Sequence, residues 1–494
     1  MPGEFDHILN SMSRRVCLIA VPGCGKTKGV LIPKLEQLLA REDIRPEQVL
    51  VLTFSRLSAL DLKQRVAHME RAPRAATVHS FALAFLISED KHEIRRRIDS
   101  IILDFEKDVL ISDVRVIFPQ QKRRELWKQL NAFSAGWATE PHDQVFEANN
   151  AQRAFKHAVV NWLSEHECAM MEEILYHAVD LGRHLDSAPH LDTPQYILVD
   201  EYQDLNRLEQ EFVERLARDS EQLMVVGDPD QSIYSFKFAH RQGITDFAAS
   251  PGVEAYTHTR TRRCAKRVAA LAAQLLTQAD PARTNLIDTD PDAEEGEIHL
   301  VRKNTHDDEF AHAFNSIRTR IASGVSAKDI IVLVPKKKLG RQFEQYAASR
   351  ASELPMKKRF AFVQKPEFSP KEQERLLLLS LHVNPNSILH ARCYLGLGDK
   401  NHFAKEFAEL KQHYGNVRVV LSTAVGDTFP KKKRRRQELC GRIVALRESL
   451  AAIDTGESLA DTIERRFMGR GSEIVVSRTA SVADAIRLLI RVAA

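Results

Sequence analysis

The stretch from Cys17 to Val30 reads CLIAVPGCGKTKGV, and it constrains the fold more than any other part of the sequence. The apolar run Val16 to Val21 is typical of a buried parallel strand. The run ends at Pro22-Gly23, and Gly25-Lys26-Thr27 opens a predicted helix that continues to Leu39. A strand, a glycine-rich turn and a helix in direct succession are the opening unit of an α/β domain.

The turn has the chemistry of a phosphate-binding loop. Backbone N–H groups of such a turn and of the following helix N-terminus point at anionic oxygens. Lys26 is expected to reach the terminal phosphates, and the Thr27 hydroxyl is expected to hold Mg²⁺. The alternative is a tight turn that binds nothing. The predicted binding residues are Ala20, Val21, Pro22, Gly23, Cys24, Gly25, Lys26 and Thr27.

Composition limits the class of protein. With 494 residues the chain is too long for one core, and two to four domains are expected. A hydrophobic content of 44% and a charged content of 28% are ordinary for a globular protein, and no apolar run approaches the ~18 residues of a membrane span. The N-terminus lacks an apolar signal core, so we expect a cytoplasmic protein. The six cysteines include no C-x-x-C pair, which argues against zinc and disulfides.

Two further strand ends add candidate residues. Val49 to Phe54 is a second buried parallel strand by its β-branched composition, and Ser58 to Met69 reads as a helix, which extends the doubly wound pattern. Phe54 at that strand end is able to stack on a base, although a core phenylalanine is the alternative. The segment Ala76 to Phe85 is a short strand followed by a helix, with His79 at the strand end; a structural role is the alternative for this histidine.

From Leu86 to about Leu185 helical periodicity dominates, without a clear parallel strand, which indicates a helical insertion.

Two acidic and amide-bearing segments follow the insertion. Tyr196 to Asp204 reads YILVDEYQD, in which a strand ends in Asp200 and Glu201. Beside a phosphate loop, one carboxylate is suited to hold Mg²⁺ and the next to orient the attacking water; an ordinary acidic turn is the alternative. Leu223 to Phe236 reads LMVVGDPDQSIYSF, a third strand with Gln231 placed to sense a terminal phosphate. Tyr234, Phe236 and Lys237 interleave aromatic rings with a cation, as a single-strand stacking groove does.

The order GxGKT, TFSRLSALDLKQR, TVHSF, VDEYQD and VGDPDQSIYSF resembles the UvrD/Rep/PcrA group of superfamily 1 DNA helicases. The five motifs span roughly residues 16–239. The resemblance implies an ATP- and Mg²⁺-dependent motor that moves 3′ to 5′ on single-stranded DNA and acts on duplex DNA. It implies phosphate binding by Lys26, Mg²⁺ binding by Thr27 and Asp200, water activation by Glu201 and γ-phosphate sensing by Gln231. It also places Phe54, His79, Tyr234, Phe236 and Lys237 toward the DNA.

Two motifs depart from the family. The family has a glutamine in an LNxxQ context that reads adenine, whereas Leu9-Asn10 is followed by Ser11-Met12-Ser13-Arg14. The segment Thr257 to Leu276 resembles the family motif whose arginine contacts the γ-phosphate across the domain cleft. Arg263 takes that position, and Arg262 replaces the preceding aromatic residue, which a guanidinium is able to imitate by stacking. A basic helix cap is the alternative.

We expect a P-loop RecA-like parallel-sheet core with a helical insertion, followed by an incomplete second RecA-like domain with its own helical insertion. The expected boundaries are 1–85 and 186–278 for the first core domain, 86–185 for its insertion, 279–350 for the start of the second, and 351–494 for the second insertion. Within the second core domain, Glu297 to Val301 and Ile330 to Val334 are predicted strands, and Glu309 to Ser323 and Leu339 to Ser349 are predicted helices. The second insertion includes a predicted helix from Ser458 to Phe467. The basic runs Lys122 to Gln129 and Lys431 to Arg436 are candidates for phosphate-backbone contacts or solvated surface.

The family ends its second core domain with motifs close to TxHxxKGLE and LxYVAxTRA, and neither occurs before Ala494. An arginine finger contributes about 10³–10⁵ to phosphoryl-transfer rates, so we expect weak ATP hydrolysis and weaker unwinding by this chain. Three functions remain open: a UvrD-type helicase, a nucleotide-gated DNA-binding protein, and half of a split enzyme whose partner polypeptide supplies the absent motifs. An unrelated P-loop kinase is disfavoured, because kinases have no need of VDEYQD followed by GDPDQSIY.

Overall fold

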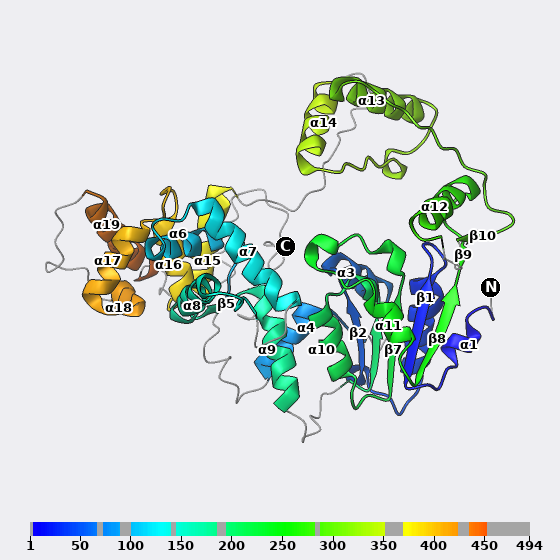
Figure 1. The fold of residues 1–494 in the computed structure, drawn as a ribbon, viewed down its shortest axis with the longest axis horizontal. Helices are drawn as coiled ribbons and strands as arrows, with labels where there is room; N and C mark the ends of the chain where they lie inside the picture. Colours follow the sequence, from blue (N-terminus) through cyan, green and yellow to red (C-terminus); the bar gives the residue numbers. More distant parts are fainter. Residues whose placement is uncertain are drawn as a thin grey trace. The chain divides into compact units, whose positions relative to one another are not determined.

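The computed structural model describes residues 3–66, 73–88, 100–139, 145–184, 194–281, 287–350, 369–422 and 434–451. Its centre is a parallel sheet of six strands (Figure 1). The strands are β1 (Arg15–Ala20), β2 (Val49–Thr53), β3 (Arg74–Thr77), β6 (Tyr196–Val199), β7 (Gln222–Gly227) and β8 (Val253–His258). They stand in the order β3-β2-β6-β7-β1-β8, and every neighbouring pair is parallel. All six therefore end at one edge, where the predicted site residues follow.

Helices cover both faces of this sheet, which explains why its four inner strands, β1, β2, β6 and β7, are mostly apolar and buried. On one face Cys17, Leu50 and Leu52 join a core built with helices α4, α9, α10 and α11. On the other face Leu18 and Val51 join a core built with α2 and α3. Alternate residues of each strand thus enter opposite cores, as the two-residue period of a strand requires. The bounds are α2 (Ile32–Leu39), α3 (Arg56–Arg65), α4 (Val78–Ser88), α9 (Met171–His184), α10 (Arg207–Leu216) and α11 (Gly243–Ala248).

The predicted strands and helices of this first domain are present. The helix after the phosphate loop begins as a π-helical segment, Lys26–Leu31, before α2, and Pro33 lies in the first turn of α2. Pro33 has no N–H to donate, so an unbroken α-helical ladder is unavailable at that point. The RecA-like class predicted for the core is confirmed. Four further elements belong to this part of the chain: α1 (Asp6–Leu9), α12 (Lys266–Ala279) and the paired strands β9 (Arg260–Thr261) and β10 (Asp288–Thr289).

The helical insertion shares one hydrophobic core with helices from the end of the chain. Leu126, Phe155 and Trp162 pack in the same cluster as Leu377 and Leu389. The helices concerned are α6 (Lys107–Ile117), α7 (Arg123–Thr139), α8 (Asn150–Glu165), α15 (Pro370–Val383) and α16 (Ile388–Gly396). A second cluster continues through α17 (Ala404–Tyr414), α18 (Val417–Ser422) and α19 (Arg434–Ala451). The expectation that the insertion has no parallel strand is wrong, because β4 (Ser100–Ile101) pairs with β5 (Cys168–Ala169); two-residue strands are too short to show a period in sequence.

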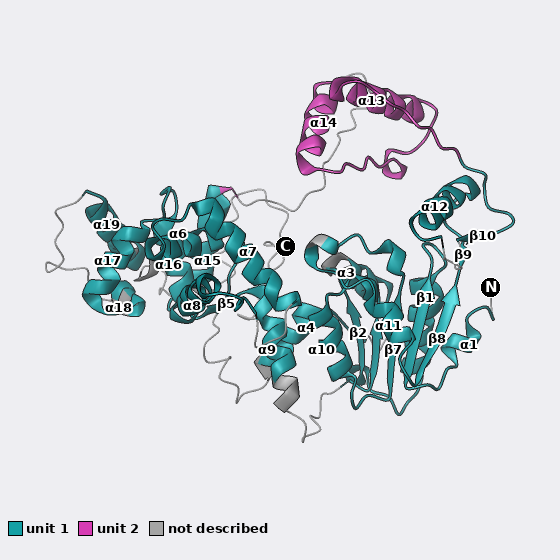
Figure 2. Cartoon of the chain, viewed as in Figure 1, with its two compact units in different colours: residues 1–296, 370–485 teal, residues 297–369, 486–494 magenta. Residues whose placement is uncertain are grey.

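The chain divides into two compact units, residues 1–296 with 370–485 and residues 297–369 with 486–494 (Figure 2). In the second unit α13 (His306–Ala322) packs on α14 (Lys337–Ser349) through Phe310, Phe314 and Phe343. The two helices match the prediction, but the predicted strands Glu297 to Val301 and Ile330 to Val334 are not strands. Leu300 is 93% exposed and Leu333 is 83% exposed, because neither segment has a ladder partner among the described residues. The predicted helix Ser458 to Phe467 lies outside the described residues.

Candidate nucleotide and nucleic-acid site

The phosphate loop joins β1 to the helix that begins at Lys26, and two glycines make its turn possible. Gly23 has a φ of +73° and Gly25 a φ of +102°, in the left-handed region that favours glycine. A Cβ atom on Gly23 would also lie 2.8 Å from Thr261 Oγ1. The loop packs directly on the segment after β8, since Arg262 N–H donates to the Gly23 carbonyl at 3.0 Å.

Lys26 and Thr27 face the end of β6. The Lys26 side chain is 8% exposed, and its Nζ donates to the Ala20 carbonyl at 2.9 Å, back across the loop. Thr27 Oγ1 donates to Asp200 Oδ2 at 3.4 Å. Burial, followed by the neighbouring Glu201 charge, raises the pKa of Asp200 to about 7, and Lys26 opposes this shift. A cation bound here would stabilise the ionised Asp200 carboxylate and offset the free-energy cost of its burial.

The Thr27–Asp200 pair fits a magnesium ion. A hydroxyl and a carboxylate are the oxygen donors that Mg²⁺ takes, and the ion usually completes its shell with water and substrate phosphates. Within the described ranges, no group of three or more His, Cys, Asp or Glu side chains is arranged to hold a metal ion. The remaining ligands would therefore come from a bound nucleotide and water.

Hydrogen bonds connect the end of β6 to the end of β7. Gln203 Nε2 donates to Glu201 Oε2 at 2.9 Å, and Gln203 Oε1 accepts from Asp228 N–H at 2.9 Å. Gln231 Nε2 donates to Asp228 Oδ2 at 2.6 Å. Glu201 itself has a φ of +54°, a strained conformation for a non-glycine residue, of the kind that concentrates at functional sites. Sequence reasoning found Glu201 and Gln231 but missed Gln203 and Asp228, which join them. Gln203 contributes its side-chain amide, and Asp228 contributes its backbone N–H and its carboxylate.

Arg263 lies beside the loop. Its Cβ abuts Gly23, and its N–H donates to Thr261 Oγ1 at 3.3 Å. The side chain is exposed. Packing of the backbone thus fixes the position of the Arg263 Cα and Cβ atoms, from which the side chain extends.

Three of the five predicted DNA-contacting residues form one cluster. The rings of Phe54 and Tyr234 lie 4.8 Å apart between centroids, and Lys237 Nζ lies 5.0 Å from the Phe54 ring and 5.2 Å from the Tyr234 ring. Phe54 is partly buried and packs against the hydrophobic core of the sheet, so its ring also meets the description of the alternative, a core phenylalanine. Ile233 and Phe238, which sequence reasoning passed over, flank the cluster and are 72% and 42% exposed.

The other two predicted DNA-contacting residues are His79 and Phe236, and the structure describes the side chain of His79 alone of these two. His79 Nδ1 lies 3.0 Å from Glu209 Oε1, and Glu209 caps α10 together with Asn206. The histidine is therefore tied to a helix start, as its structural alternative requires. Phe236 lies in a short 3₁₀ turn, and its side chain is outside the described part of the chain.

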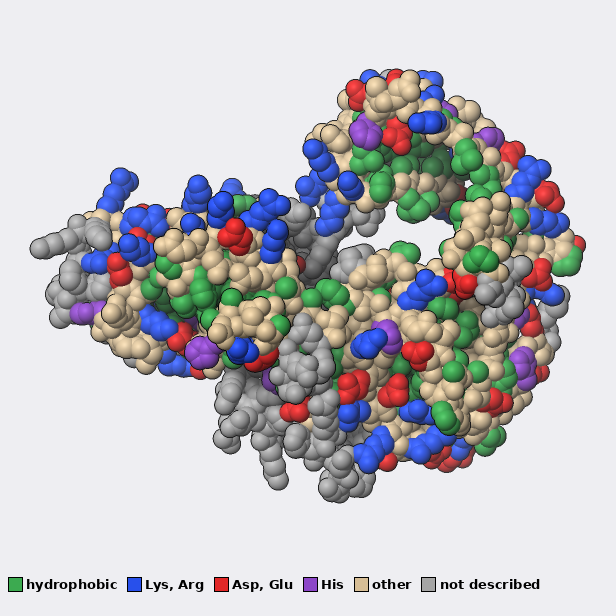
Figure 3. Space-filling view, in the orientation of Figure 1, with side chains coloured by type: hydrophobic (Ala, Val, Ile, Leu, Met, Phe, Trp, Pro, Cys, Tyr) green, Lys and Arg blue, Asp and Glu red, His purple; other side chains and the backbone are tan. Residues whose placement is uncertain are grey.

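The basic runs are engaged within the protein only in part. Arg435 pairs with Asp399 at 2.8 Å and with Glu406 at 2.9 Å, while Lys431 to Lys433 are outside the described residues. On α7, Arg123 pairs with Asp108, which leaves the exposed Lys122, Arg124 and Lys128. Figure 3 shows Lys and Arg side chains gathered along one edge of the helical part.

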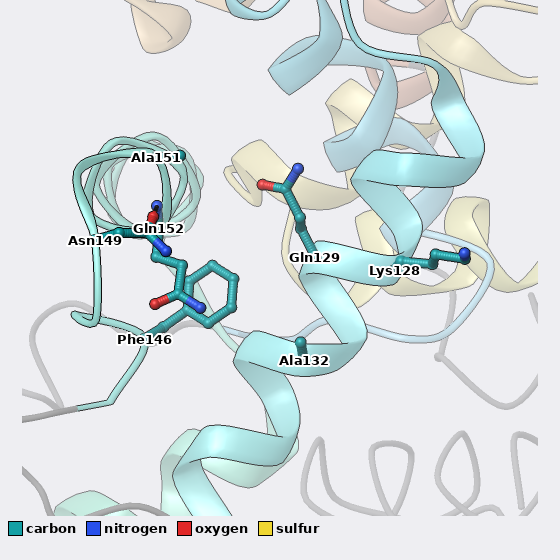
Figure 4. Close-up of a pocket in the computed structure, with 7 residues that line it drawn as sticks. All are labelled: Lys128, Gln129, Ala132, Phe146, Asn149, Ala151 and Gln152. Atoms are coloured by element: carbon teal, nitrogen blue, oxygen red, sulfur yellow. Dashed lines mark hydrogen bonds between the residues drawn. The ribbon is translucent and has the colours of Figure 1, made fainter.

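The described residues of the first unit line at least two hollows. One, of about 250 Å³, opens beside the phosphate loop and is lined by Val21, Pro22, Asp228, Asp230, Gln231, Ala272, Leu275, Leu276 and Ile287. It adjoins the predicted γ-phosphate sensor Gln231, so we assign it to the candidate nucleotide site. The other, of about 300 Å³, lies between α7 and α8. There Phe146 and Gln152 face α7 while Lys128 points away (Figure 4), so no cation is aimed into this hollow.

The N-terminal segment contacts both α2 and the surroundings of the phosphate loop. The Leu9 carbonyl accepts from Lys34 Nζ at 2.8 Å and Asn10 Oδ1 accepts from Gln37 at 3.1 Å, so Leu9-Asn10 packs along α2. Glu4 and Phe5, and not Leu9-Asn10, lie beside the phosphate loop. Glu4 pairs with Arg262 and with His258. These residues carried no motif, and only the fold brings them to the site.

Comparison with known proteins identifies the family. The UvrD/REP helicase N-terminal domain family matches residues 3–251, about half of the chain. The chain belongs to the UvrD/REP helicase family. It is 29% identical to the ATP-dependent DNA helicase PcrA of Staphylococcus epidermidis over 260 residues, which cover 50% of this chain and 36% of that protein. It is 23% identical to a probable DNA helicase II homolog of Mycoplasma capricolum over 367 residues, which cover 70% of this chain and 50% of that protein.

The chain thus spans at most about half the length of these UvrD/REP relatives. The matched family region contains the loop, the Asp200-Glu201 pair and the Gln231 turn, and it stops short of Arg263. In the described part of the chain, none of the helices is both long and apolar enough to cross a membrane.

Proposed function

We propose that this UvrD/REP chain is an ATP- and Mg²⁺-dependent DNA helicase that moves 3′ to 5′ along single-stranded DNA. Lys26 and the loop N–H groups bind the nucleotide phosphates, and Thr27 and Asp200 hold the Mg²⁺ ion, which neutralises phosphate charge. Glu201 orients and deprotonates the attacking water, and Gln231 and Arg263 contact the γ-phosphate. DNA bases stack on Phe54 and Tyr234 beside Lys237.

A continuous set of hydrogen bonds from Glu201 to Gln231 supports this proposal. The bonds from Glu201 through Gln203 and Asp228 to Gln231 form an unbroken chain, and Tyr234 and Lys237 follow three and six residues later. A DNA base that moves the turn at Tyr234 would therefore move Gln231 and, through this chain of hydrogen bonds, the groups that contact the Glu201 carboxylate. This arrangement supports ATP hydrolysis that depends on DNA.

The test measures ATP hydrolysis with and without single-stranded DNA. We expect DNA to stimulate hydrolysis and Lys26→Ala to abolish it, because the ammonium is the loop's only side-chain cation aimed into the fold. Lys28→Ala is the matched control, since Lys28 is exposed two residues away and should change little. Turnover that ignores DNA, or that survives Lys26→Ala, would contradict the proposal.

A second function is favoured by the second unit. The segments 297–301 and 330–334 have no strand partners among the described residues, and a phosphoryl-transfer site that lacks an arginine finger hydrolyses ATP slowly. In that case the chain is a nucleotide-gated DNA-binding protein, or one half of a split enzyme completed by a partner polypeptide. ATP would then change DNA affinity while turnover stays negligible, and rapid turnover by the isolated chain would rule this function out.

A further inference from the structure

Asp204 lies on a short segment that contacts both the candidate nucleotide site and the turn that carries Lys237. Its N–H donates to the carbonyl of Glu201, the proposed water-activating residue, at 2.9 Å. The next carbonyl along the chain, that of Leu205, accepts from the His240 N–H at 2.8 Å, three residues after Lys237. The backbone around Asp204 is therefore fixed to both sites.

The Asp204 carboxylate is buried and only partly satisfied. The side chain is 7% exposed, and its Oδ1 atom has no hydrogen-bond partner among the described residues. Ser232 bonds to the carboxylate, and the same hydroxyl donates to the Gln203 carbonyl at 3.2 Å. A hydroxyl has one proton to donate, so it serves one of these two acceptors at a time. A protonated Asp204 resolves the competition, because it donates to the Ser232 oxygen and leaves the Ser232 proton for Gln203.

Charges of both signs act on Asp204. Burial, followed by the Glu201 charge, raises the pKa of Asp204 to about 7, and Ser232, Lys237 and Lys26 oppose this rise. The Lys237 side chain is exposed, so a DNA phosphate is able to pair with it. Such a phosphate neutralises a charge that favours the ionised carboxylate. Asp204 then holds a proton more tightly near neutral pH.

We propose that Asp204 takes up a proton from solvent when single-stranded DNA engages Lys237, and that this proton links DNA binding to the nucleotide site. The inference rests on the proposed DNA-binding function of Lys237 and its neighbouring rings, and it adds a residue that carries the coupling. Protonation removes a negative charge beside Glu201 and leaves the Ser232 hydroxyl to hold the Gln203 carbonyl. Asp204 acts through these neighbours, so it is a positioning residue.

The experiment measures the affinity of the full chain, without nucleotide, for a fluorescent thymidine oligonucleotide between about pH 6 and pH 8.5. Wild-type affinity should fall about 5-fold or more as pH rises, because DNA and the proton strengthen each other's binding. Asp204→Asn cannot ionise, so it should bind at the highest pH as tightly as wild type binds at the lowest. Asp219→Asn, on an exposed residue, is the matched control and should behave as wild type.

Two histidines on neighbouring elements, His79 on α4 and His240 after the Lys237 turn, are present in all three proteins. Their contribution to the pH dependence of DNA affinity therefore cancels when Asp204→Asn is compared with wild type. A purely structural role for Asp204 would instead weaken DNA binding by the same factor at every pH, and that result would overturn the inference.

Calorimetry tests the inference without the Asp204 variant, in case that variant does not fold. Wild-type protein titrated with the oligonucleotide near neutral pH, in two buffers of different ionisation enthalpy, should take up a measurable fraction of a proton. Lys237→Gln has no ammonium charge to lose and should take up less. DNA binding by wild type without proton uptake overturns this inference and leaves the proposed function standing, whereas a chain that binds no single-stranded DNA overturns both.

Discussion

At the scale of single residues, backbone geometry decides how the loop meets its surroundings. Gly23 combines a positive φ with close contact to the segment that carries Arg262 and Arg263. The absence of a side chain at this position therefore serves both the turn and the approach of Arg263 to the loop. A methyl group there would separate two parts of the predicted nucleotide site.

Gly23→Ala tests this double requirement. The left-handed conformation should cost an alanine about 1–2 kcal/mol, and the collision with Thr261 and Arg263 should add to this cost. We expect a lower melting temperature and weaker ATP binding. Gly252→Ala is the matched control, because Gly252 has a φ of +79° but an added Cβ would have no neighbour within 4 Å. Equal effects of the two substitutions would show that the contact with Arg263 contributes nothing.

At the scale of elements, α6 and α16 meet at a buried acid. Glu106 is 1% exposed, its Oε2 accepts from Leu103 N–H at 2.8 Å, and its Oε1 lies 3.8 Å from His390 Nε2. Burial raises the pKa of Glu106 to about 8, against its ordinary 4.5, and lowers the pKa of His390 to about 4. Near neutral pH the interface therefore holds a neutral carboxylic acid beside a neutral imidazole.

The Glu106 proton makes stability depend on pH. Between pH 4.5 and about 8 the folded chain keeps a proton that the unfolded chain has released, so stability falls as pH rises through this window. Glu106→Gln cannot ionise and should escape this loss. The variant should therefore gain stability relative to wild type from pH 5 to pH 8, measured by urea unfolding.

His390 acts in the opposite direction, between about pH 4 and 6.5, and it is shared by both proteins, so it cancels in the difference. Glu448→Gln, on an exposed position of α19, is the control. A constant difference between wild type and Glu106→Gln across this range would refute the assignment.

Sequence reasoning located the strand ends because each carries its own chemistry: Lys26-Thr27, Asp200-Glu201 and Gln231 follow apolar runs that two helical layers bury. It failed where chemistry depends on packing between distant segments. Gln203 looks like an ordinary turn residue until its amide is seen to bridge Glu201 and Asp228. Likewise Glu4 lies outside every motif, and only the approach of β8 to the loop brings it to Arg262.

At the scale of the whole molecule, the structure joins two helical regions that the sequence suggested as separate insertions. The Arg392 side chain on α16 is fully buried and bonds to Asp113 on α6 at 2.6 and 3.1 Å. Trp162 Nε1 donates to the same carboxylate at 2.9 Å. Periodicity predicts each helix but not its partner, because an apolar stripe says nothing about which stripe covers it. Residues 297–369 thus separate, along the chain, two stretches that share one core.

This connectivity predicts that the first unit survives cutting of the chain. Protease sites introduced at the exposed residues 299–302 and 369–371 would release residues 1–298 from the C-terminal part. We expect the two fragments to remain together after cleavage, so that a tag on the N-terminus retrieves α15–α19, because the shared core and the buried Arg392–Asp113 pair hold them. Arg392→Ala should weaken this association, since breaking a buried ion pair costs about 3–5 kcal/mol, whereas Arg447→Ala on an exposed position of α19 should not. Fragments that separate on size-exclusion chromatography under native conditions would mean that the helices at the end of the chain form a core of their own.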